Sequence, residues 1–147
     1  MSNEQIQIIA GDVATDHRGQ IRFVNGFDMT EVKRFYIIKN SDTNLVRGWR
    51  GHRIEKRWFY VLSGAFFVDI VKIDDWNRTS PELPIKRFRL SQTDQKVLYV
   101  PEGHATALKS ICKDSEMLIY ADHGIVDAKS DDHTWPLDYF INLKQYD

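Results

Sequence analysis

Short runs rich in β-branched and aromatic residues recur along the whole chain, and several of them alternate apolar with polar positions. Each run is bounded by Gly, Pro, Asn, Asp or Ser, which is typical of short β-strands separated by turns. We find no convincing helical stripe and no internal repeat. Strands are therefore predicted within residues 21–27, 32–39, 56–73, 85–91, 96–100, 104–110 and 116–122.

Two groups of turn residues divide these runs. Ser63-Gly64 lies between two strong strand patterns and predicts a tight hairpin turn. Pro101-Glu102-Gly103 predicts a second turn between apolar runs. Residues 5–9 and 137–147 are ambiguous between strand and helix. Many short strands at this spacing predict an all-β sandwich or barrel.

Length and composition describe an ordinary globular chain and exclude several classes of protein. With 147 residues, of which 42% are apolar and 28% charged, we expect one domain over residues 1–147 whose core needs no disulfides. Cys112 is the lone cysteine, and the N-terminus does not resemble a signal peptide, so a cytoplasmic location is expected. The 20 basic residues nearly balance the 21 acidic ones, which gives no bulk attraction to nucleic acid or membrane.

The densest group of chemically useful side chains lies between Arg47 and Arg57. In an extended strand, Arg50 and His52 share one face because side chains alternate with a period of two. Such a face lines a pocket if it points into a barrel. It is a solvated basic edge if it points outward, and the pattern leaves both interpretations open.

A second candidate group follows the turn at residues 101–103. This turn directs His104 or Thr106 from the start of the next predicted strand. A single histidine near a turn is more often a surface residue than a catalyst, so a surface position is the alternative interpretation.

Several motifs resemble those of the cupins, small β-barrels of the jelly-roll type. Gly48 to Gly64 and Pro101-x-Gly103 resemble the two cupin sequence blocks. The chain is similar over nearly its whole length to the nucleotide-sugar branch, typified by dTDP-4-dehydrorhamnose 3,5-epimerase, and also resembles dTDP-4-keto-6-deoxyglucose 3,4-ketoisomerases. The resemblance implies an all-β cupin jelly-roll barrel. The matching segments are Asp16-His17-Arg18-Gly19, Arg34-Phe35-Tyr36, Val46-Arg47-Gly48-Trp49, His52-Arg53, Ser80-Pro81, Leu90-Ser91 and Leu98 to Gly103.

Many cupins hold a metal ion, but this chain lacks two of the usual ligands. The resemblance places Arg50 and Thr106 where those cupins have histidines. A guanidinium has no lone pair to give and carries a permanent positive charge. His52, Glu55 and His104 remain, but two of the usual anchors of a transition-metal site are gone. We expect no metal and no other cofactor, and a metal-dependent cupin enzyme is an alternative hypothesis.

The resemblance implies proton abstraction beside a ketone, by a histidine base and a tyrosine acid, with fixed positive charge that stabilises the enolate. The base position of the 3,5-epimerases is Arg50 here, which cannot accept a proton, and Asp122-His123 replaces the family's Asp-Tyr. The ketoisomerase pattern instead indicates His52 as base, Tyr36 as acid or orienter and Arg57 as enolate clamp. Arg50, on the same face, is expected to lower the pKa of His52.

The remaining candidates are expected to bind substrate. Arg47 matches a family arginine that holds the sugar or phosphate, and Arg50 is a further candidate for binding substrate. The charge run from Arg53 to Arg57 faces either a diphosphate or solvent. His104 and His123 are further candidates for the same pocket. Four aromatic residues either stack on a thymine ring or fill the core, namely Trp49, Trp58, Phe59 and Tyr60.

Together these features predict an isomerase, either an epimerase or a ketoisomerase, that acts on a dTDP-4-keto-6-deoxy sugar in surface polysaccharide biosynthesis. The alternative is a cupin that binds a nucleotide sugar without turnover. The resemblance also implies a homodimer in which an N-terminal strand crosses to the partner subunit. Residues 6–9 and 21–27 are the candidate strands, and Arg18 is expected to reach the partner's pocket.

Overall fold

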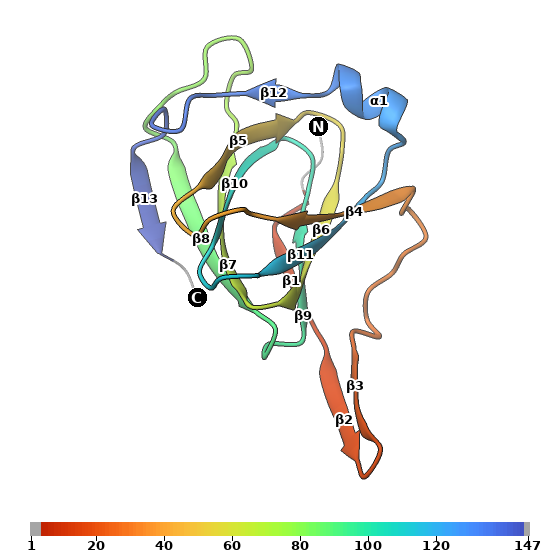
Figure 1. The fold of residues 1–147 in the computed structure, drawn as a ribbon. Helices are drawn as coiled ribbons and strands as arrows, with labels where there is room; N and C mark the ends of the chain where they lie inside the picture. The colour runs from red at the N-terminus through yellow and green to blue at the C-terminus, as the bar shows by residue number, and fades with distance from the viewer. Residues whose placement is uncertain (1–3, 146–147) are drawn as a thin grey trace.

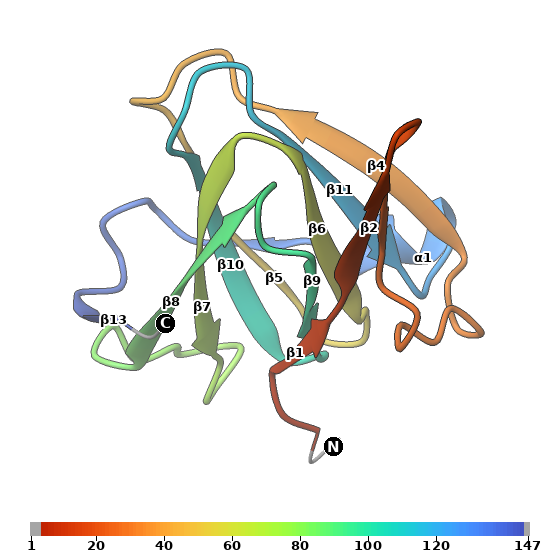
Figure 2. The same ribbon diagram turned by 90° about the horizontal axis from the view of Figure 1, so that it is seen from below.

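A computed structural model describes residues 4–145 and consists almost entirely of β-strands (Figure 1). A five-stranded sheet has the order β1, β9, β6, β11, β4, and a six-stranded sheet has the order β12, β5, β10, β7, β8, β13. Figure 2 shows the two sheets on opposite sides of one barrel. All pairings are antiparallel except that of β13 with β8. The predicted all-β barrel of the cupin type is therefore confirmed.

Most strands coincide with the apolar runs of the sequence, whereas the strands at residues 12–16, 46–52 and 133–134 lie outside those runs. The five-stranded sheet consists of β1 (Gln7–Ala10), β9 (Lys96–Val100), β6 (Arg57–Ser63), β11 (Glu116–Ala121) and β4 (Arg34–Lys39). The six-stranded sheet consists of β12 (His133–Thr134), β5 (Val46–His52), β10 (His104–Ser110), β7 (Ala65–Lys72), β8 (Pro84–Ser91) and β13 (Asn142–Gln145). A separate hairpin contains β2 (Asp12–Asp16) and β3 (Gly19–Phe23), and the one described helix is α1 (Ile125–Ser130).

The core lies between the two sheets. Alternate residues of β4 and β11 are buried more deeply than their neighbours, as expected for strands with one face toward a core. Both sheets contribute fully buried side chains, and burial of each stabilises the fold by about 1.5–3 kcal/mol. The main cluster includes Phe59, Leu98 and Ile119 from the five-stranded sheet and Phe66, Val68 and Leu90 from the six-stranded sheet.

The predicted turn at Ser63-Gly64 is present, but the predicted hairpin is wrong. Gly64 has φ +71°, and a Cβ there would collide with Ser115. However, β6 pairs with β9 and β11, whereas β7 pairs with β8 and β10. The turn therefore carries the chain from one sheet to the other. Local turn chemistry predicts the reversal of the chain, while the partner of each strand is decided by packing across the whole barrel.

The two ambiguous terminal segments end as edge strands. Residues 7–10 form β1 against β9, and residues 142–145 form β13 against β8, so neither becomes a helix. Residues 146–147 of the second segment lie outside the described residues.

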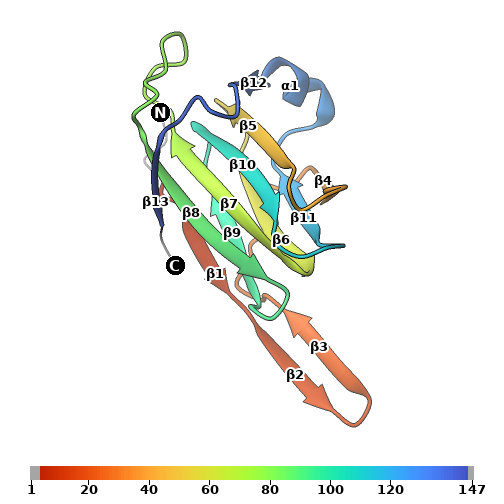
Figure 3. The same ribbon diagram turned by 60° about the vertical axis from the view of Figure 1, so that its left-hand side comes forward.

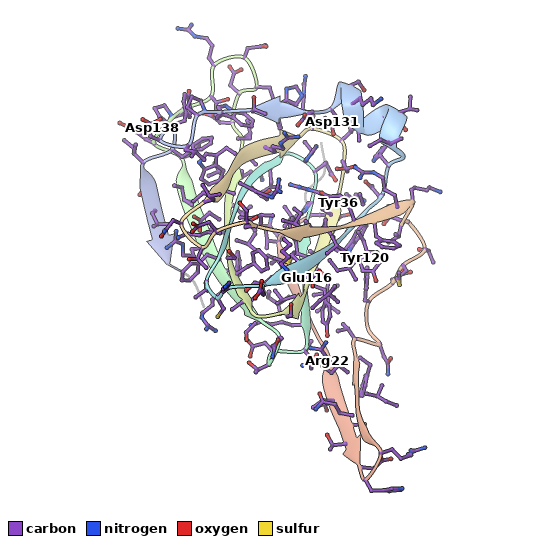
Figure 4. All side chains as sticks on the ribbon, in the orientation of Figure 1. Arg22, Tyr36, Glu116, Tyr120, Asp131 and Asp138 are labelled. Carbon is purple, nitrogen blue, oxygen red and sulfur yellow. The ribbon has the colours of Figure 1, made fainter. Side chains whose placement is uncertain are left out.

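The β2–β3 hairpin projects away from the barrel (Figures 1 and 3). Nearly all of its residues are exposed, and these include the apolar Val13 and Ile21. Arg22, which Figure 4 labels where the hairpin joins the barrel, donates hydrogen bonds to the carbonyls of Leu62 and Gln92. The hairpin is thus bound to the barrel at its base and exposed to solvent along its length.

Candidate functional site

A cavity of about 1260 Å³ opens between β4, β5, β6, β10 and the segment from α1 to Leu137. The inward face of β6 explains its position. Arg57, Phe59 and Val61 are all buried and share one face, but only the first of them is polar. Along this face the barrel therefore changes from an apolar core to a polar-lined space, which we name the central cavity.

The central cavity is rich in positive charge although the whole chain carries a net charge of only −1. Two acidic side chains, Glu55 and Asp132, also line it. An excess of fixed cations in a partly enclosed space favours an anionic ligand. The cations that line the cavity are Arg34, Lys39, Arg47, Arg50, Arg57 and Lys129.

His52, at the end of β5, is the titratable base of the cavity. Its ring is buried, and Nδ1 lies 3.0 Å from the main-chain carbonyl oxygen of Asp131. A carbonyl only accepts hydrogen bonds, so Nδ1 carries the proton and donates it, which leaves the lone pair of the neutral ring on Nε2. The arrangement provides a proton acceptor with a defined orientation.

Burial, and after it the nearby guanidinium of Arg57, lower the pKa of His52 to about 3. Both effects disfavour the imidazolium form because it would be a poorly hydrated cation beside another cation. The negative charge of Asp131 acts in the opposite direction and is outweighed. His52 is therefore neutral at physiological pH.

The expected role of Arg50 as the charge that lowers the pKa of His52 is wrong. Arg50 lines the cavity as His52 does, but its side chain is 63% exposed and pairs with Asp132 at 3.1 Å. The cations that depress this pKa are Arg57 and Arg34 instead. A long side chain on the predicted face can extend to the rim, where water and a carboxylate screen its charge.

Asp131 organises the loop that follows β5. Its Oδ1 accepts the backbone N–H of Arg53 at 2.8 Å, and its Oδ2 accepts those of Ile54 and Glu55 at 3.1 and 3.0 Å. Figure 4 labels this residue between α1 and β12. The buried carboxylate of Asp131 thus satisfies three consecutive backbone donors, while the main-chain carbonyl of the same residue orients His52.

Arg57 and Glu55 are buried charged residues that line the central cavity. Arg57 is buried, and its Nη2 donates to Thr106 Oγ1 at 2.8 Å, so the threonine that replaces a cupin histidine holds a cation in place. Glu55 accepts from Arg34 Nη2 at 2.9 Å. Burial raises the pKa of Glu55, and the charges of Arg34 and Arg57 partly oppose that rise.

Tyr36 and Arg47, two of the predicted site residues, line the cavity from β4 and β5. The guanidinium of Arg34 lies 5.1 Å from the ring centroid of Tyr36, and Arg47 Nε donates to Asn40 Oδ1 at 3.1 Å. The structure therefore brings together Tyr36, Arg47, Arg50, His52 and Arg57 from the residues predicted to form the site.

Three other predicted residues lie outside the lining of the cavity. His104 is buried, with Nδ1 3.0 Å from the carbonyl oxygens of both Pro101 and Glu102. His123 contacts the carboxylate of the adjacent Asp122 through Nδ1 at 2.7 Å. Arg18 lies next to the turn of the β2–β3 hairpin and pairs with Asp16. Each side chain thus interacts with its own local segment.

The aromatic residues proposed for base stacking divide between the cavity and the core. Trp49 lines the cavity, and so does Trp135, which the sequence did not single out. Phe59 is fully buried in the core, and Trp58 stacks on Tyr99 with ring centroids 5.3 Å apart. Tyr60 packs beside this second aromatic cluster.

Sequence reasoning missed Arg34 and Asp131 as site residues. Arg34 belongs to the Arg-x-Tyr motif that contains Tyr36, so that motif was a usable signal. Asp131 lies 79 positions from His52, and no local pattern connects the two. Glu55 was considered only as a possible metal ligand.

Of the donors that remain from the cupin metal pattern, His52 and Glu55 lie close together, whereas Nδ1 of His104 contacts the carbonyl oxygens of its own turn. Among residues 4–145, no group of three or more His, Cys, Asp or Glu side chains is placed to hold a metal ion.

No helix in the same range is long and apolar enough to cross a membrane.

Comparison with known proteins finds one matching family model and a set of solved structures that share the fold. Residues 4–144 match the family model described as WxcM-like, C-terminal (FdtA). A comparison with curated proteins found no match. The fold is shared with solved structures at low sequence identity.

Three of these structures illustrate the likeness. WlaRB, a TDP-quinovose 3,4-ketoisomerase from Campylobacter jejuni, is 19% identical with a TM-score of 0.62, over 82% of this chain and 87% of that one. QdtA, a sugar 3,4-ketoisomerase from Thermoanaerobacterium thermosaccharolyticum in complex with TDP, is 18% identical with a TM-score of 0.68, over 94% and 93%. The RmlC epimerase of Mycobacterium tuberculosis is 18% identical with a TM-score of 0.71, over 100% and 82%.

Proposed function

This chain belongs to the WxcM-like, C-terminal family, and from that premise we propose that it is an isomerase of dTDP-4-keto-6-deoxy sugars. The proposed reaction is 3,4-ketoisomerisation by proton transfer next to the ketone, without a metal ion. The named activities of the ketoisomerases and the epimerase that share the fold support this substrate class. Arg50 and Thr106 at the cupin ligand positions support chemistry by side chains alone.

One observation carries the proposal. His52 is neutral, its Nδ1–H is fixed on the carbonyl of Asp131, and its free Nε2 belongs to a ring that lines a cavity containing Arg57 and Arg34. Abstraction of a proton beside a ketone needs an oriented base and positive charge where the enolate oxygen forms. The site contains both.

In the proposed mechanism, His52 Nε2 removes the proton from C3 of the sugar. The C3–H electron pair forms the C3–C4 double bond, and the carbonyl π electrons move to O4, where Arg57 stabilises the negative charge. Tyr36 transfers a proton between O3 and O4, so that the enediolate charge resides on O3. When the C3 ketone forms, C4 takes the proton back from Nε2. One histidine thus serves both carbons, and no proton is gained or lost overall.

The rest of the substrate is proposed to occupy the remainder of the central cavity. Arg47 and Arg50 have the fork geometry that binds phosphate oxygens bidentately. Trp49 and Trp135 provide apolar walls for the base or the sugar. His104 and His123 are not part of this proposed site, because neither lines the cavity.

Incubation with dTDP-4-keto-6-deoxyglucose in deuterated water, followed by NMR, tests this function. We expect the 3-keto isomer to appear in a reaction that a His52→Gln variant does not catalyse. Absence of a new isomer and of deuterium at C3, C4 and C5 would refute the isomerase. Calorimetry with dTDP on the same samples shows whether the cavity binds the nucleotide.

A specific observation favours a second candidate, a cupin that binds a nucleotide sugar without turnover. Arg50 occupies the position that the resemblance assigns to the epimerase base, where a guanidinium cannot accept a proton, and its charge is paired with Asp132. Binding of dTDP with no isomer formed would select this candidate.

We also propose that the protein is a cytoplasmic homodimer that serves surface polysaccharide biosynthesis. The projecting β2–β3 hairpin supports the dimer, because its exposed Val13 and Ile21 lack a covering surface of their own. In that dimer Arg18, near the hairpin turn, would reach the central cavity of the partner.

A further inference from the structure

One oxygen of the Glu55 carboxyl group accepts a hydrogen bond, and the other has no hydrogen-bond partner. Glu55 is 2% exposed and lines the central cavity. Its Oε1 accepts from Arg34 Nη2 at 2.9 Å, but its buried Oε2 has no hydrogen-bond partner. Among the described residues only Glu102 shares this condition. Buried polar atoms are nearly always paired, so an orphan at a candidate active site needs a reason.

A titratable group, the imidazole of His52, lies close to this oxygen. Glu55 Oε2 lies 3.7 Å from His52 Nδ1, just beyond hydrogen-bond distance. Asp131 Oδ2 is 3.9 Å from the same nitrogen, but it already accepts two backbone N–H groups. Glu55 Oε2 is therefore the carboxylate oxygen with free lone pairs beside the ring.

Charged groups from other elements also act on Glu55. Arg34 of β4 and Arg57 of β6 favour its anionic form, and Asp122, which follows β11, disfavours it. Burial is the largest influence and raises the pKa of this carboxyl. The same arginines oppose a proton on His52. The histidine therefore needs a nearby anion whenever it becomes an imidazolium.

We infer that Glu55 is a positioning residue of His52, whose Oε2 accepts the Nδ1–H bond while the ring carries a second proton. This inference rests on the proposed function, in which His52 Nε2 removes a proton from carbon. The neutral ring donates to the Asp131 carbonyl, and the charged ring shifts its donation to the carboxylate. A movement of less than about 1 Å closes the present gap to a charge-assisted hydrogen bond.

The proton balance is simple. The proton taken from the sugar carbon stays on Nε2 until it returns to the neighbouring carbon. The Nδ1 proton stays on Nδ1 throughout and only changes its acceptor. Glu55 gains no proton in the cycle, which fits an oxygen that is shielded from solvent and acts through the histidine.

Kinetics of Glu55→Gln test the inference, because glutamine keeps the size of the side chain and the contact to Arg34 but removes the charge. We expect kcat to fall at least about 10-fold, as expected for weakened acid–base catalysis, with KM changed less than about 2-fold. Glu55→Asp should recover part of the loss. Glu82→Gln, at an exposed glutamate outside the cavity, is the matched control and should be unchanged. An unaltered kcat in Glu55→Gln would overturn the inference.

NMR of the wild-type protein provides a readout that needs no turnover. With ¹³C at glutamate carboxyls and ¹⁵N at histidine rings, the ring nitrogens of His52 should shift with the same midpoint as the carboxyl of Glu55. A purely structural Glu55 would titrate while the His52 ring stays unchanged, and that result would overturn the inference. Coupled titration without isomerase activity would refute the proposed function alone. Isomerase activity without coupling would refute the role of Glu55 alone.

Discussion

Asp131 controls His52 twice, although 79 positions separate them in the chain. Its carbonyl oxygen lies 3.0 Å from His52 Nδ1, and its carboxylate binds the three backbone N–H groups that follow His52. The orientation of the base and the shape of the adjoining loop therefore depend on one residue at the end of α1. The geometry around His52 therefore depends on the contact between β5 and the residue after α1, and not on the sequence of β5 alone.

Replacing Asp131 should cost both stability and activity. Asp131→Ala leaves buried backbone donors at residues 53–55 without an acceptor, and we expect a loss of about 3 kcal/mol in the free energy of unfolding. The proposed isomerase activity should fall as well, because the loop that directly follows His52 is released. Urea denaturation and the isomerase assay measure the two effects. Asp138→Ala, at an exposed aspartate, is the control, and equal stability of the two variants would contradict the prediction.

The depressed pKa of His52 predicts how stability depends on pH. The histidine takes up a proton near pH 6.5 in the unfolded chain but only near pH 3 in the folded one. The contribution of neutral, buried His52 to the free energy of unfolding is therefore complete above pH 6.5 and is lost as the pH falls toward 3. From pH 7.5 to 5 the wild type should lose about 2 kcal/mol more than His52→Gln. Urea denaturation of both proteins at the two pH values measures this difference, and equal losses would show that His52 titrates normally.

Arg57 is expected to stabilise charge in the reaction and to depress the pKa of His52. Arg57→Gln should reduce kcat about 10²- to 10³-fold, by analogy with loss of an oxyanion donor. It should also raise the midpoint of the His52 ring titration, since the Arg57 charge lowers that pKa. Steady-state kinetics and histidine NMR measure the two effects. Thr106→Val removes only the hydrogen bond to Arg57 and should show a smaller effect on both.

Arg50→His tests whether a histidine at position 50 can act as the base of an epimerase reaction. The substitution restores a histidine where the resemblance places the epimerase base, and Arg50 is exposed enough for the fold to tolerate it. We expect stability to change by less than about 1 kcal/mol, because exposed ion pairs contribute little. Deuterium should appear at C5 of the sugar in this variant and not in the wild type. Arg50→Gln controls for loss of the pair with Asp132, and exchange at C5 in that variant would exclude a new base as the cause.

The proposed dimer depends on the bare hairpin. Ile21 is 66% exposed on β3, so a charge there should cost a monomer nothing but should weaken an interface that covers it. We expect the wild type to elute as a dimer in size-exclusion chromatography with light scattering, and Ile21→Glu to shift it toward the monomer. Val126→Glu, at an exposed apolar residue of α1, is the control. A monomeric wild type would contradict the proposal.

The all-β class of the fold and several of the residues that line the central cavity follow from the sequence. Alternating apolar runs predict strands because one face of each strand must be buried, and that requirement is local. Alternation also predicts that Arg50 and His52 share one face if their segment is extended, and it places Arg57 in the predicted strand of residues 56–73. The motif with Arg34 and Tyr36 belongs to the same local information.

Strand pairing and the surroundings of His52 depend on the folded arrangement of the whole chain. The turn at Ser63-Gly64 joins two sheets, because strand pairing is set by burial across the barrel and not by the turn. The contacts of His52 with Asp131 and Glu55, and the depression of its pKa by burial and Arg57, come from four different elements or loops. Electrostatic effects depend on distance and solvent access, and both exist only once the chain is folded.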